Sequence, residues 1–268
     1  RMVEWRDVHM PDLHWAPQGL PGTLKKLPGW VARAAGESRF AGEVLKFEAD
    51  LPFARYSQTP VPRQVLVIPG FGFGDAATLP MQTALKRAGF KVVCSDIVLN
   101  VRCSDRAVDK LAEVARQAVE RDGKRLMAVG HSRGGMLARG LAARHPELVS
   151  TAVSLGAPLN DEFAFYEIPQ PFVSVLKVVH QLDPELRERQ CVTANCTCPY
   201  MQATHRPFPE DVELVSYYTT SDGIVDWRAC VVPGAENIEV AGSHLGMGLR
   251  PATVRMVVER LVRSAEVY

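Results

Sequence analysis

The sequence predicts an α/β fold in which a mostly parallel, doubly wound sheet is covered by helices on both faces. From Gln64 onward, short runs of Val, Leu and Ile alternate with amphipathic stretches. Near-continuous apolar runs are typical of strands buried on both faces. Strict alternation of strand and helix implies right-handed crossovers and therefore parallel strands. A chain of 268 residues can form one such domain and is short for two.

Six segments are expected to form the strands of this sheet. Each is a short apolar run, and the first ends at Pro69-Gly70, a pair that terminates strands. In chain order the expected strands are Gln64 to Ile68, Lys91 to Cys94, Leu126 to Val129, Val149 to Leu155, Val212 to Tyr218 and Ile238 to Val240.

Three amphipathic helices are expected between and after these strands. In Ser104 to Asp122 the apolar residues recur at spacings of three and four, with Ser104 placed to cap the start and Gly123 just past the end. A second helix over Arg133 to Arg144 stops before Pro146, and Pro251 opens the third.

Two segments depart from this alternation. Residues 1–62 hold seven of the nineteen prolines and three of the four tryptophans without a sustained pattern, so an irregular N-terminal wrap is expected. Residues 160–210 are expected to form a cap or lid insertion containing one helix, Phe172 to Leu182. The alternative for this insertion is a solvated loop with one packed helix. Both segments are assigned to a single domain, 1–268.

Charge and composition exclude several partners. Lys and Arg number 31 against 30 Asp and Glu, so the net charge of +1 predicts neither nucleic-acid nor anionic-membrane binding. No run of 18 apolar residues is present, so no integral membrane segment is expected. The chain opens at Arg1 without an initiator Met; either a leader was removed or the sequence was trimmed. A cytoplasmic and a secreted location both stay open.

Three of the six cysteines crowd together as Cys191-x4-Cys196-x-Cys198, seven residues before His205. The spacing does not match the paired C-x-x-C arrangement of zinc ribbons, so one local disulfide and no bound metal are expected. Reduced thiols and a zinc site are the alternatives.

The strongest chemical motif is Gly130-His131-Ser132-Arg133-Gly134, which lies between an expected strand and an expected helix. A nucleophile elbow needs this context, because small residues around the serine permit the strained turn that exposes its hydroxyl. Ser132 is therefore the candidate nucleophile.

A neutral serine hydroxyl requires a base that is oriented by a carboxylate. Asp222 follows the fifth expected strand, and His244 follows the sixth, so both are expected at the carboxyl edge of the sheet. Asp226 is a rival acid. It precedes Trp227 and Arg228, where it is expected to cap a short helical stretch or to pair with Arg228. Asp222 is therefore preferred.

Catalysis by such a serine also needs donors for the developing oxyanion. The candidates are the backbone N–H groups of Phe71, in the glycine-rich loop after the first strand, and of Arg133. That loop is not a dinucleotide fingerprint, because the third glycine position holds Asp75. No cofactor is expected. The candidate apolar lining of the substrate site comprises Phe73, Phe163, Phe165 and Phe172.

The loop Pro69-Gly70-Phe71-Gly72, the elbow at 130–134, the segment Ser221-Asp222-Gly223 and Gly242-Ser243-His244 resemble the α/β-hydrolase lipases and esterases, and most of all the small bacterial ones. The resemblance covers Gln64 to Val262. It implies the α/β-hydrolase fold, a Ser132–His244–Asp222 triad and an acyl-enzyme on Ser132. Many relatives carry His-Gly where this chain has Pro69-Gly70.

The expected activity is hydrolysis of carboxylic esters, with a small-molecule or lipid ester as substrate. One alternative is an acyltransferase on the same scaffold, which differs only in excluding water and binding an acceptor. The other is an inert binding protein with this fold. The oligomeric state is left open.

Overall fold

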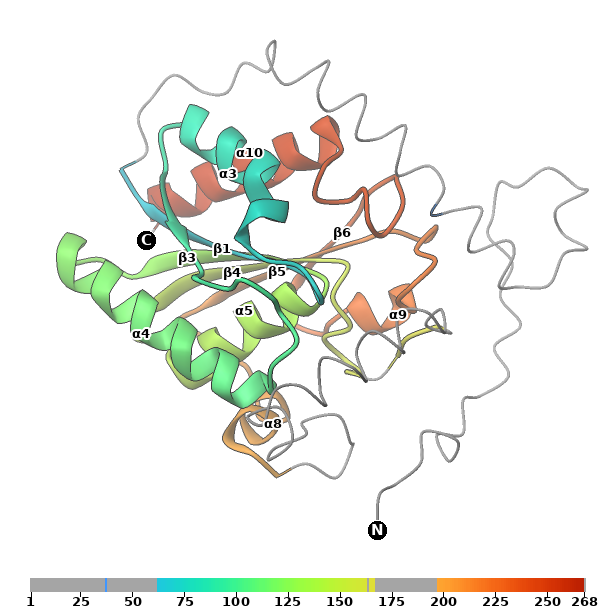
Figure 1. Ribbon diagram of the computed structural model, residues 1–268, viewed down its shortest axis with the longest axis horizontal. Coiled ribbons are helices and arrows are strands. Elements are labelled where there is room, and N and C mark those ends of the chain that lie inside the picture. Colours follow the sequence, from blue (N-terminus) through green and yellow to red (C-terminus); the bar gives the residue numbers. More distant parts are fainter. Residues whose placement is uncertain (1–36, 38–61, 163, 167–196, 268) are drawn as a thin grey trace, which may run out of the picture.

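The computed structural model describes residues 37, 62–162, 164–166 and 197–267 (Figure 1). Six strands form one sheet in the order β2-β1-β3-β4-β5-β6, and every neighbouring pair is parallel. The prediction of a parallel sheet is confirmed. The strands are β1 (Gln64–Ile68), β2 (Lys91–Cys94), β3 (Leu126–His131), β4 (Val149–Leu155), β5 (Glu213–Tyr218) and β6 (Glu236–Glu239).

Helices cover both faces of the sheet, as predicted. In Figure 1, α3 (Leu79–Arg87) and α10 (Pro251–Val267) lie on one face, and α4 (Ser104–Asp122) and α5 (Arg133–Arg144) lie on the other. The short α8 (Pro199–Thr204) lies beside α4 and α5, and α9 (Trp227–Cys230) follows β5. A 3-10 turn, η4 (Asp75–Thr78), precedes α3.

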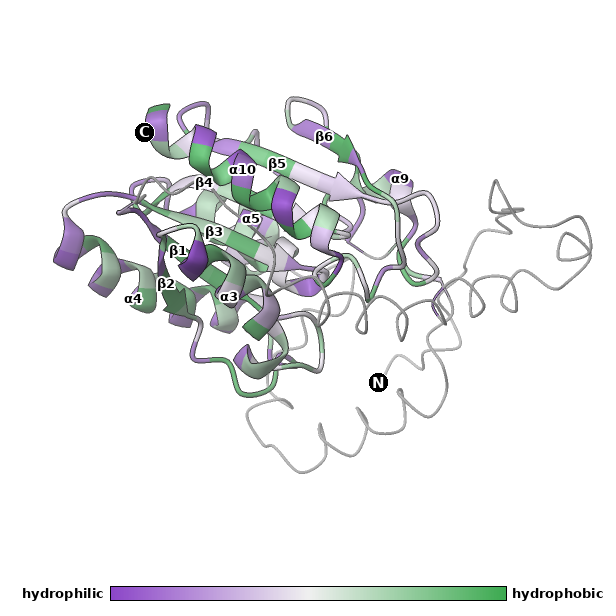
Figure 2. Cartoon of the chain, turned by 90° about the horizontal axis from the view of Figure 1, so that it is seen from above, coloured by the Kyte–Doolittle hydropathy of each residue, from purple (hydrophilic) through white to green (hydrophobic). Residues whose placement is uncertain are grey.

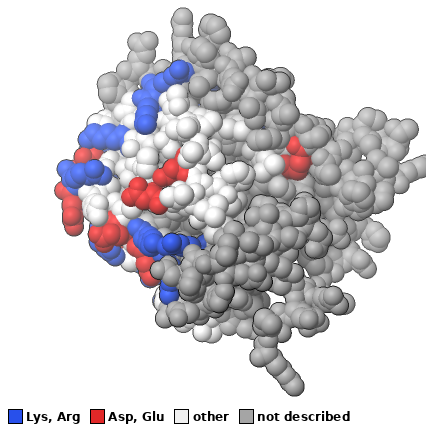
Figure 3. Space-filling model, in the orientation of Figure 1, with Lys and Arg blue, Asp and Glu red and all other residues white. Residues whose placement is uncertain are grey.

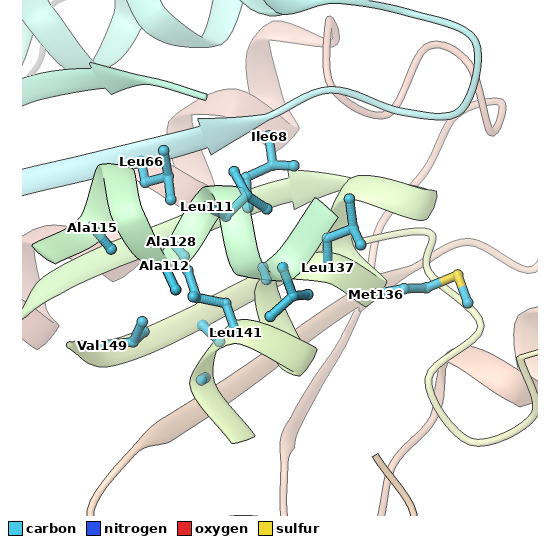
Figure 4. Close-up of a cluster of buried hydrophobic side chains, with 14 of the residues drawn as sticks. Leu66, Ile68, Leu111, Ala112, Ala115, Ala128, Met136, Leu137, Leu141 and Val149 are labelled. Carbon is cyan, nitrogen blue, oxygen red and sulfur yellow. The ribbon is translucent and has the colours of Figure 1, made fainter. Parts of the chain in front are cut away.

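Two hydrophobic cores follow from the two-residue period of the strands. In β1, Leu66 and Ile68 pack among residues of α4 and α5, as Figure 4 shows, whereas Val65 and Val67 pack with α3 and α10. Because successive side chains point to opposite faces, one continuous apolar strand contributes to both cores. Hydrophilic and hydrophobic residues alternate along α4 and α10, which is typical of helices with one buried side (Figure 2).

Most predicted boundaries agree with the structure, and the differences have local causes. α4 and α5 match their predicted ranges, and Gly123 ends α4 at a left-handed φ of 68°. The prediction of Ser104 as the cap of α4 is wrong: Cys103 is at that position, without a side-chain cap, and Ser104 is the first helical residue. β6 is an edge strand with exposed Glu236 and Glu239, so its apolar pattern is incomplete and its predicted range was shifted.

Two of the described helices, α3 and α8, were not predicted. Each begins with a proline within its first two residues and offers few apolar positions for a periodic signal. α8 belongs to the expected cap insertion, and Tyr200 of this helix is buried in the core formed with α4 and α5. The predicted helix Phe172 to Leu182, and nearly all of the predicted N-terminal wrap, lie outside the described residues.

Asp105 joins three helices and provides a test of the packing. Its carboxylate accepts hydrogen bonds from Arg144 at 3.1 Å and from the backbone N–H of Tyr200 at 2.9 Å, and its side chain is 6% exposed. Asp105→Ala is expected to lower the free energy of unfolding by about 3 kcal/mol, because it removes the buried acceptor shared by Arg144 and the Tyr200 N–H and leaves that buried N–H without this partner. Urea denaturation measures the change.

Asp109 is the matched control for this prediction. It contacts the same Arg144 at 2.8 Å, but its side chain is 56% exposed. Asp109→Ala should therefore change the free energy of unfolding by no more than about 0.5 kcal/mol. Equal losses in the two variants would contradict the assignment of Asp105 as the buried link.

Two surface properties of the described ranges bear on partners. Within them, no helix combines the length and the apolar character that crossing a bilayer requires. On the described part of the face in Figure 3, basic and acidic side chains are interspersed and do not gather into a patch of one sign.

Candidate active site

Ser132 occupies a strained turn between β3 and α5. Its φ of 52° and ψ of −123° lie in a region that residues with a Cβ rarely adopt. The backbone N–H of Ser132 donates to Leu155 O at 2.7 Å, which ties the turn to the end of β4. A Cβ at Gly130 would lie 2.1 Å from the backbone of Gly134, so glycine is required for the turn to close. A nucleophile elbow requires a strained turn of this kind between a strand and a helix.

Asp222 and His244 meet at the same edge of the sheet. Asp222 follows β5 and His244 follows β6, and Nδ1 of His244 lies 2.6 Å from Oδ2 of Asp222. Both side chains are buried, with exposed fractions of 2% for His244 and 1% for Asp222. Since Nδ1–H donates to the carboxylate, Nε2 of the neutral ring is left as the acceptor.

Backbone groups fix the orientation of the Asp222 carboxylate. Oδ1 accepts hydrogen bonds from the N–H groups of Ile224 at 2.9 Å and Val225 at 2.7 Å, which leaves Oδ2 for His244. Gly156 also lies against the ring: it has a left-handed φ of 59°, and a Cβ there would lie 3.1 Å from Nδ1 of His244. A side chain at residue 156 would therefore crowd the imidazole.

The pKa values of His244 and His131 are shifted in opposite directions. Burial lowers the pKa of His244, but the charge of Asp222, its hydrogen bond and the charge of Glu37 outweigh burial and raise that pKa above its ordinary value. Burial, with a further contribution from His244, lowers the pKa of His131 to about 4. His131 is therefore neutral at pH 7.

His131 connects the elbow to the segment that follows β6 and carries His244, residues 240–250, called the His244 loop below. Its Nε2 lies 2.8 Å from the backbone carbonyl of His244, and the two rings are 5.0 Å apart between centroids. Because the neutral ring donates from Nε2, this bond holds the segment around His244 beside the residue that precedes Ser132.

Asn100 connects the glycine-rich loop to the start of α5. Its Nδ2 donates to Pro69 O at 2.7 Å, and its Oδ1 accepts from Arg133 Nε at 3.0 Å. The backbone of Asn100 also accepts from Gly72 N at 3.0 Å and donates to Phe73 O at 2.8 Å. The guanidinium of Arg133 lies over the Phe71 ring, 5.8 Å from its centroid. Both segments that carry the candidate oxyanion donors are thus held by one buried side chain.

Asp226 lies away from His244 and caps α9. Its side chain accepts hydrogen bonds from the backbone N–H of Arg228 at 3.1 Å and from the Arg228 guanidinium at 3.2 Å. Both roles expected for Asp226 from the sequence are present, and the contact with the histidine belongs to Asp222.

The candidate lining residues are only partly described. Phe73 is 48% exposed on the glycine-rich loop. Phe165 pairs with Val225 in an isolated bridge and packs at the margin of the core. Phe163 and Phe172 lie outside the described residues, as do Cys191 and Cys196, so the disulfide expected there stays a prediction. Within the described ranges, no cluster of His, Cys, Asp and Glu is suited to hold a metal ion.

Three residues of this site were missed by reasoning from the sequence. His131 could have been noticed as a polar residue inside the elbow motif. Asn100 and Glu37 carry no sequence signal, because they act through contacts between segments that are distant along the chain. Glu37 accepts from backbone N–H groups 186 to 208 residues away.

Comparisons with known proteins agree with this architecture. Residues 64–177 match a family model described as alpha/beta hydrolase fold. The mature lipase BlEst2 of Bacillus licheniformis superposes with a TM-score of 0.56 at 13% identity, covering 76% of this chain and 94% of that one. No curated protein matches in sequence.

Two further lipases show the same likeness. A soluble variant of the Saccharomyces cerevisiae monoglyceride lipase gives a TM-score of 0.52 at 15% identity, over 80% of this chain and 89% of that one. The Paleococcus ferrophilus monoacylglycerol lipase gives 0.51 at 18% identity, over 76% and 96%. At these identities the likeness establishes the fold.

Proposed function

The chain has the α/β-hydrolase fold, and we propose that it is a serine hydrolase that cleaves carboxylic esters through an acyl-enzyme on Ser132. One observation carries the proposal: the buried Asp222–His244 pair, joined at 2.6 Å, lies at the sheet edge where the strained turn holds Ser132. A buried carboxylate–imidazole pair costs desolvation free energy, so its presence beside a strained serine is typical of a catalytic site.

In the proposed reaction, His244 accepts the proton of Ser132 as Oγ attacks the ester carbonyl. Asp222 holds the imidazole in the correct tautomer and stabilises the imidazolium. His244 then passes the proton to the leaving alcohol, and an acyl group remains on Ser132. Water, activated by the same histidine, releases the acid and restores the serine.

The developing oxyanion is assigned to the backbone N–H groups of Phe71 and Arg133. Arg133 opens α5, so its N–H lies at the positive end of the helix dipole. The Asn100 bonds to Pro69 and Arg133 support this assignment, because they hold the two donor segments together before substrate arrives. Preorganised donors of this kind avoid the cost of reorientation during the reaction.

One exposed aromatic ring on the glycine-rich loop supports an ester with a hydrophobic acyl or alcohol part. Phe73 is half-exposed on the loop that carries Phe71, where a substrate chain can cover it. The three structural neighbours described above are lipases, which supports such a substrate.

A panel of p-nitrophenyl esters from acetate to palmitate tests the proposal. We expect saturable hydrolysis, with a kcat/KM that peaks at one acyl-chain length. That length indicates the size of the acyl pocket. Adding primary alcohols as acceptors and analysing the products separates hydrolysis from acyl transfer. Absence of turnover on the whole panel, with folded protein, would contradict ester hydrolysis.

A further inference from the structure

Glu37 contacts both segments that carry the proposed catalytic pair. These are residues 219–226, called the Asp222 loop, and the His244 loop. Its Oε1 accepts hydrogen bonds from the N–H groups of Gly223 and His244, both at 2.9 Å. Its Oε2 accepts from the N–H of Leu245 at 3.1 Å. Gly223 directly follows Asp222, so one carboxylate is bonded to the residue beside the acid and to the histidine itself.

We propose that Glu37 is a positioning residue that fixes the spacing between the Asp222 loop and the His244 loop. This inference rests on the proposed function, and it adds a residue from outside the segment that matches the hydrolase family model. Glu37 binds backbone N–H groups. In the proposed reaction, the substrate is contacted by Ser132 and the oxyanion donors and not by Glu37.

The chemistry of these contacts supports a positioning role. Hydrogen bonds from N–H groups to an ionised carboxylate are roughly twice as strong as neutral ones. Side-chain hydrogen bonds from His244 to Asp222 and from Thr219 Oγ1 to Gly242 O, at 3.1 Å, also join the two loops. Glu37 adds a link of its own, because one of its bonds reaches the loop that carries Asp222 and two reach the loop that carries His244.

Geometry of this kind matters for rate. The imidazole must receive a proton from Ser132 while it stays bonded to Asp222. A displacement of about 1 Å in a catalytic group can lower the rate by about 100-fold. Loss of the Glu37 carboxylate frees the two loops to separate, so it should act on kcat more than on KM.

The charge of Glu37 gives a second, independent readout. Among the described residues, the charges of Asp222 and Glu37 act on the His244 ring, and the neutral ring of His131 lies 5.0 Å from it between centroids. Asp222 and Glu37 both raise the pKa of His244 against the effect of burial. Removing the Glu37 charge should therefore lower that pKa and move the acidic limb of the kcat/KM profile to lower pH.

The test compares Glu37→Gln, which removes the charge, with Glu37→Asp, which keeps it on a shorter side chain. For Glu37→Gln we expect kcat to fall between about 10-fold and 100-fold with KM nearly unchanged. Its His244 pKa, measured by NMR titration of the ¹⁵N-labelled ring, should fall. Glu37→Asp should keep the His244 pKa close to that of the wild type and show an intermediate kcat.

Glu213→Gln is the control for a purely structural carboxylate. Glu213 begins β5, at the opposite edge of the sheet, where it is paired with Arg260 and accepts from Ser264. This variant should lower the midpoint of thermal unfolding without changing kcat or the His244 titration.

Two results would overturn the proposal: a Glu37→Gln enzyme with wild-type kcat, or a Glu37→Gln protein whose His244 titration does not move. If the wild-type protein hydrolyses no ester, the proposed function is wrong. The His244 titration of Glu37→Gln then decides by itself whether Glu37 acts on the histidine. The two failures are therefore distinguishable.

Discussion

Replacing Ser132 with alanine should lower kcat for ester hydrolysis by about 10⁶-fold, because the acyl-enzyme can no longer form. The fold should be retained. Alanine and serine meet the same backbone strain at φ 52°, and the turn is held by the Ser132 N–H bond to Leu155, which alanine keeps. Steady-state kinetics with the best p-nitrophenyl ester, together with thermal unfolding, measures both effects.

Ser150→Ala is the matched control. Ser150 is also buried, at the amino end of β4, where its hydroxyl donates to Leu126 O at 3.3 Å. Its loss should reduce stability and leave kcat close to that of the wild type. Turnover by Ser132→Ala that approaches the wild-type rate would remove Ser132 from its proposed role.

Replacing Asp222 with asparagine should lower kcat by roughly 10³-fold to 10⁴-fold. Asparagine can keep Oδ1 as the acceptor for Ile224 and Val225, so its amide nitrogen faces Nδ1 of His244. The amide donates there, so the ring proton moves to Nε2 and the base is lost. The imidazolium also loses the carboxylate that stabilises it. The measurement is kcat at a pH above the acidic limb of the wild-type pH–rate profile, where His244 of the wild type is neutral.

Asp226→Asn provides the comparison for the second acid. Asp226 bonds to Arg228, whose side chain is 54% exposed, and caps the short α9. Its substitution should cost little stability, because asparagine caps a helix as well as aspartate does and the ion pair lost is exposed, and it should cost little in kcat. If Asp226→Asn is the more damaging of the two variants, the acid of the triad is Asp226 and the assignment of Asp222 is wrong.

The fold was predictable because its signals are local. β1 and β4 are fully buried apolar runs and match their predicted ranges, and α4 carries an uninterrupted helical period. The edge strand β2 also matches its predicted range, because its Val-Val-Cys run is apolar although partly exposed. The edge strand β6 and the proline-initiated α3 were shifted or missed, because partial exposure weakens the periodic pattern on which such predictions depend.

The candidate site was predictable only in part. Ser132, Asp222 and His244 each follow a strand, and parallel strands bring their carboxyl ends to one edge of the sheet. The residues that orient them are different. Asn100 and Glu37 act through hydrogen bonds to backbone groups far away in the chain. Backbone donors and acceptors are present at nearly every residue, so such partners leave no pattern in a single sequence.

The most direct test of the proposed function is covalent labelling with a fluorophosphonate, which reacts with an activated serine. Intact-protein mass spectrometry of the full chain should show one adduct, and peptide mapping should locate it on Ser132. Ser132→Ala should remain unlabelled, and Asp222→Asn should react far more slowly than the wild type. Folded wild-type protein that takes up no label, or an adduct on a different residue, would contradict the assignment of Ser132 as the nucleophile.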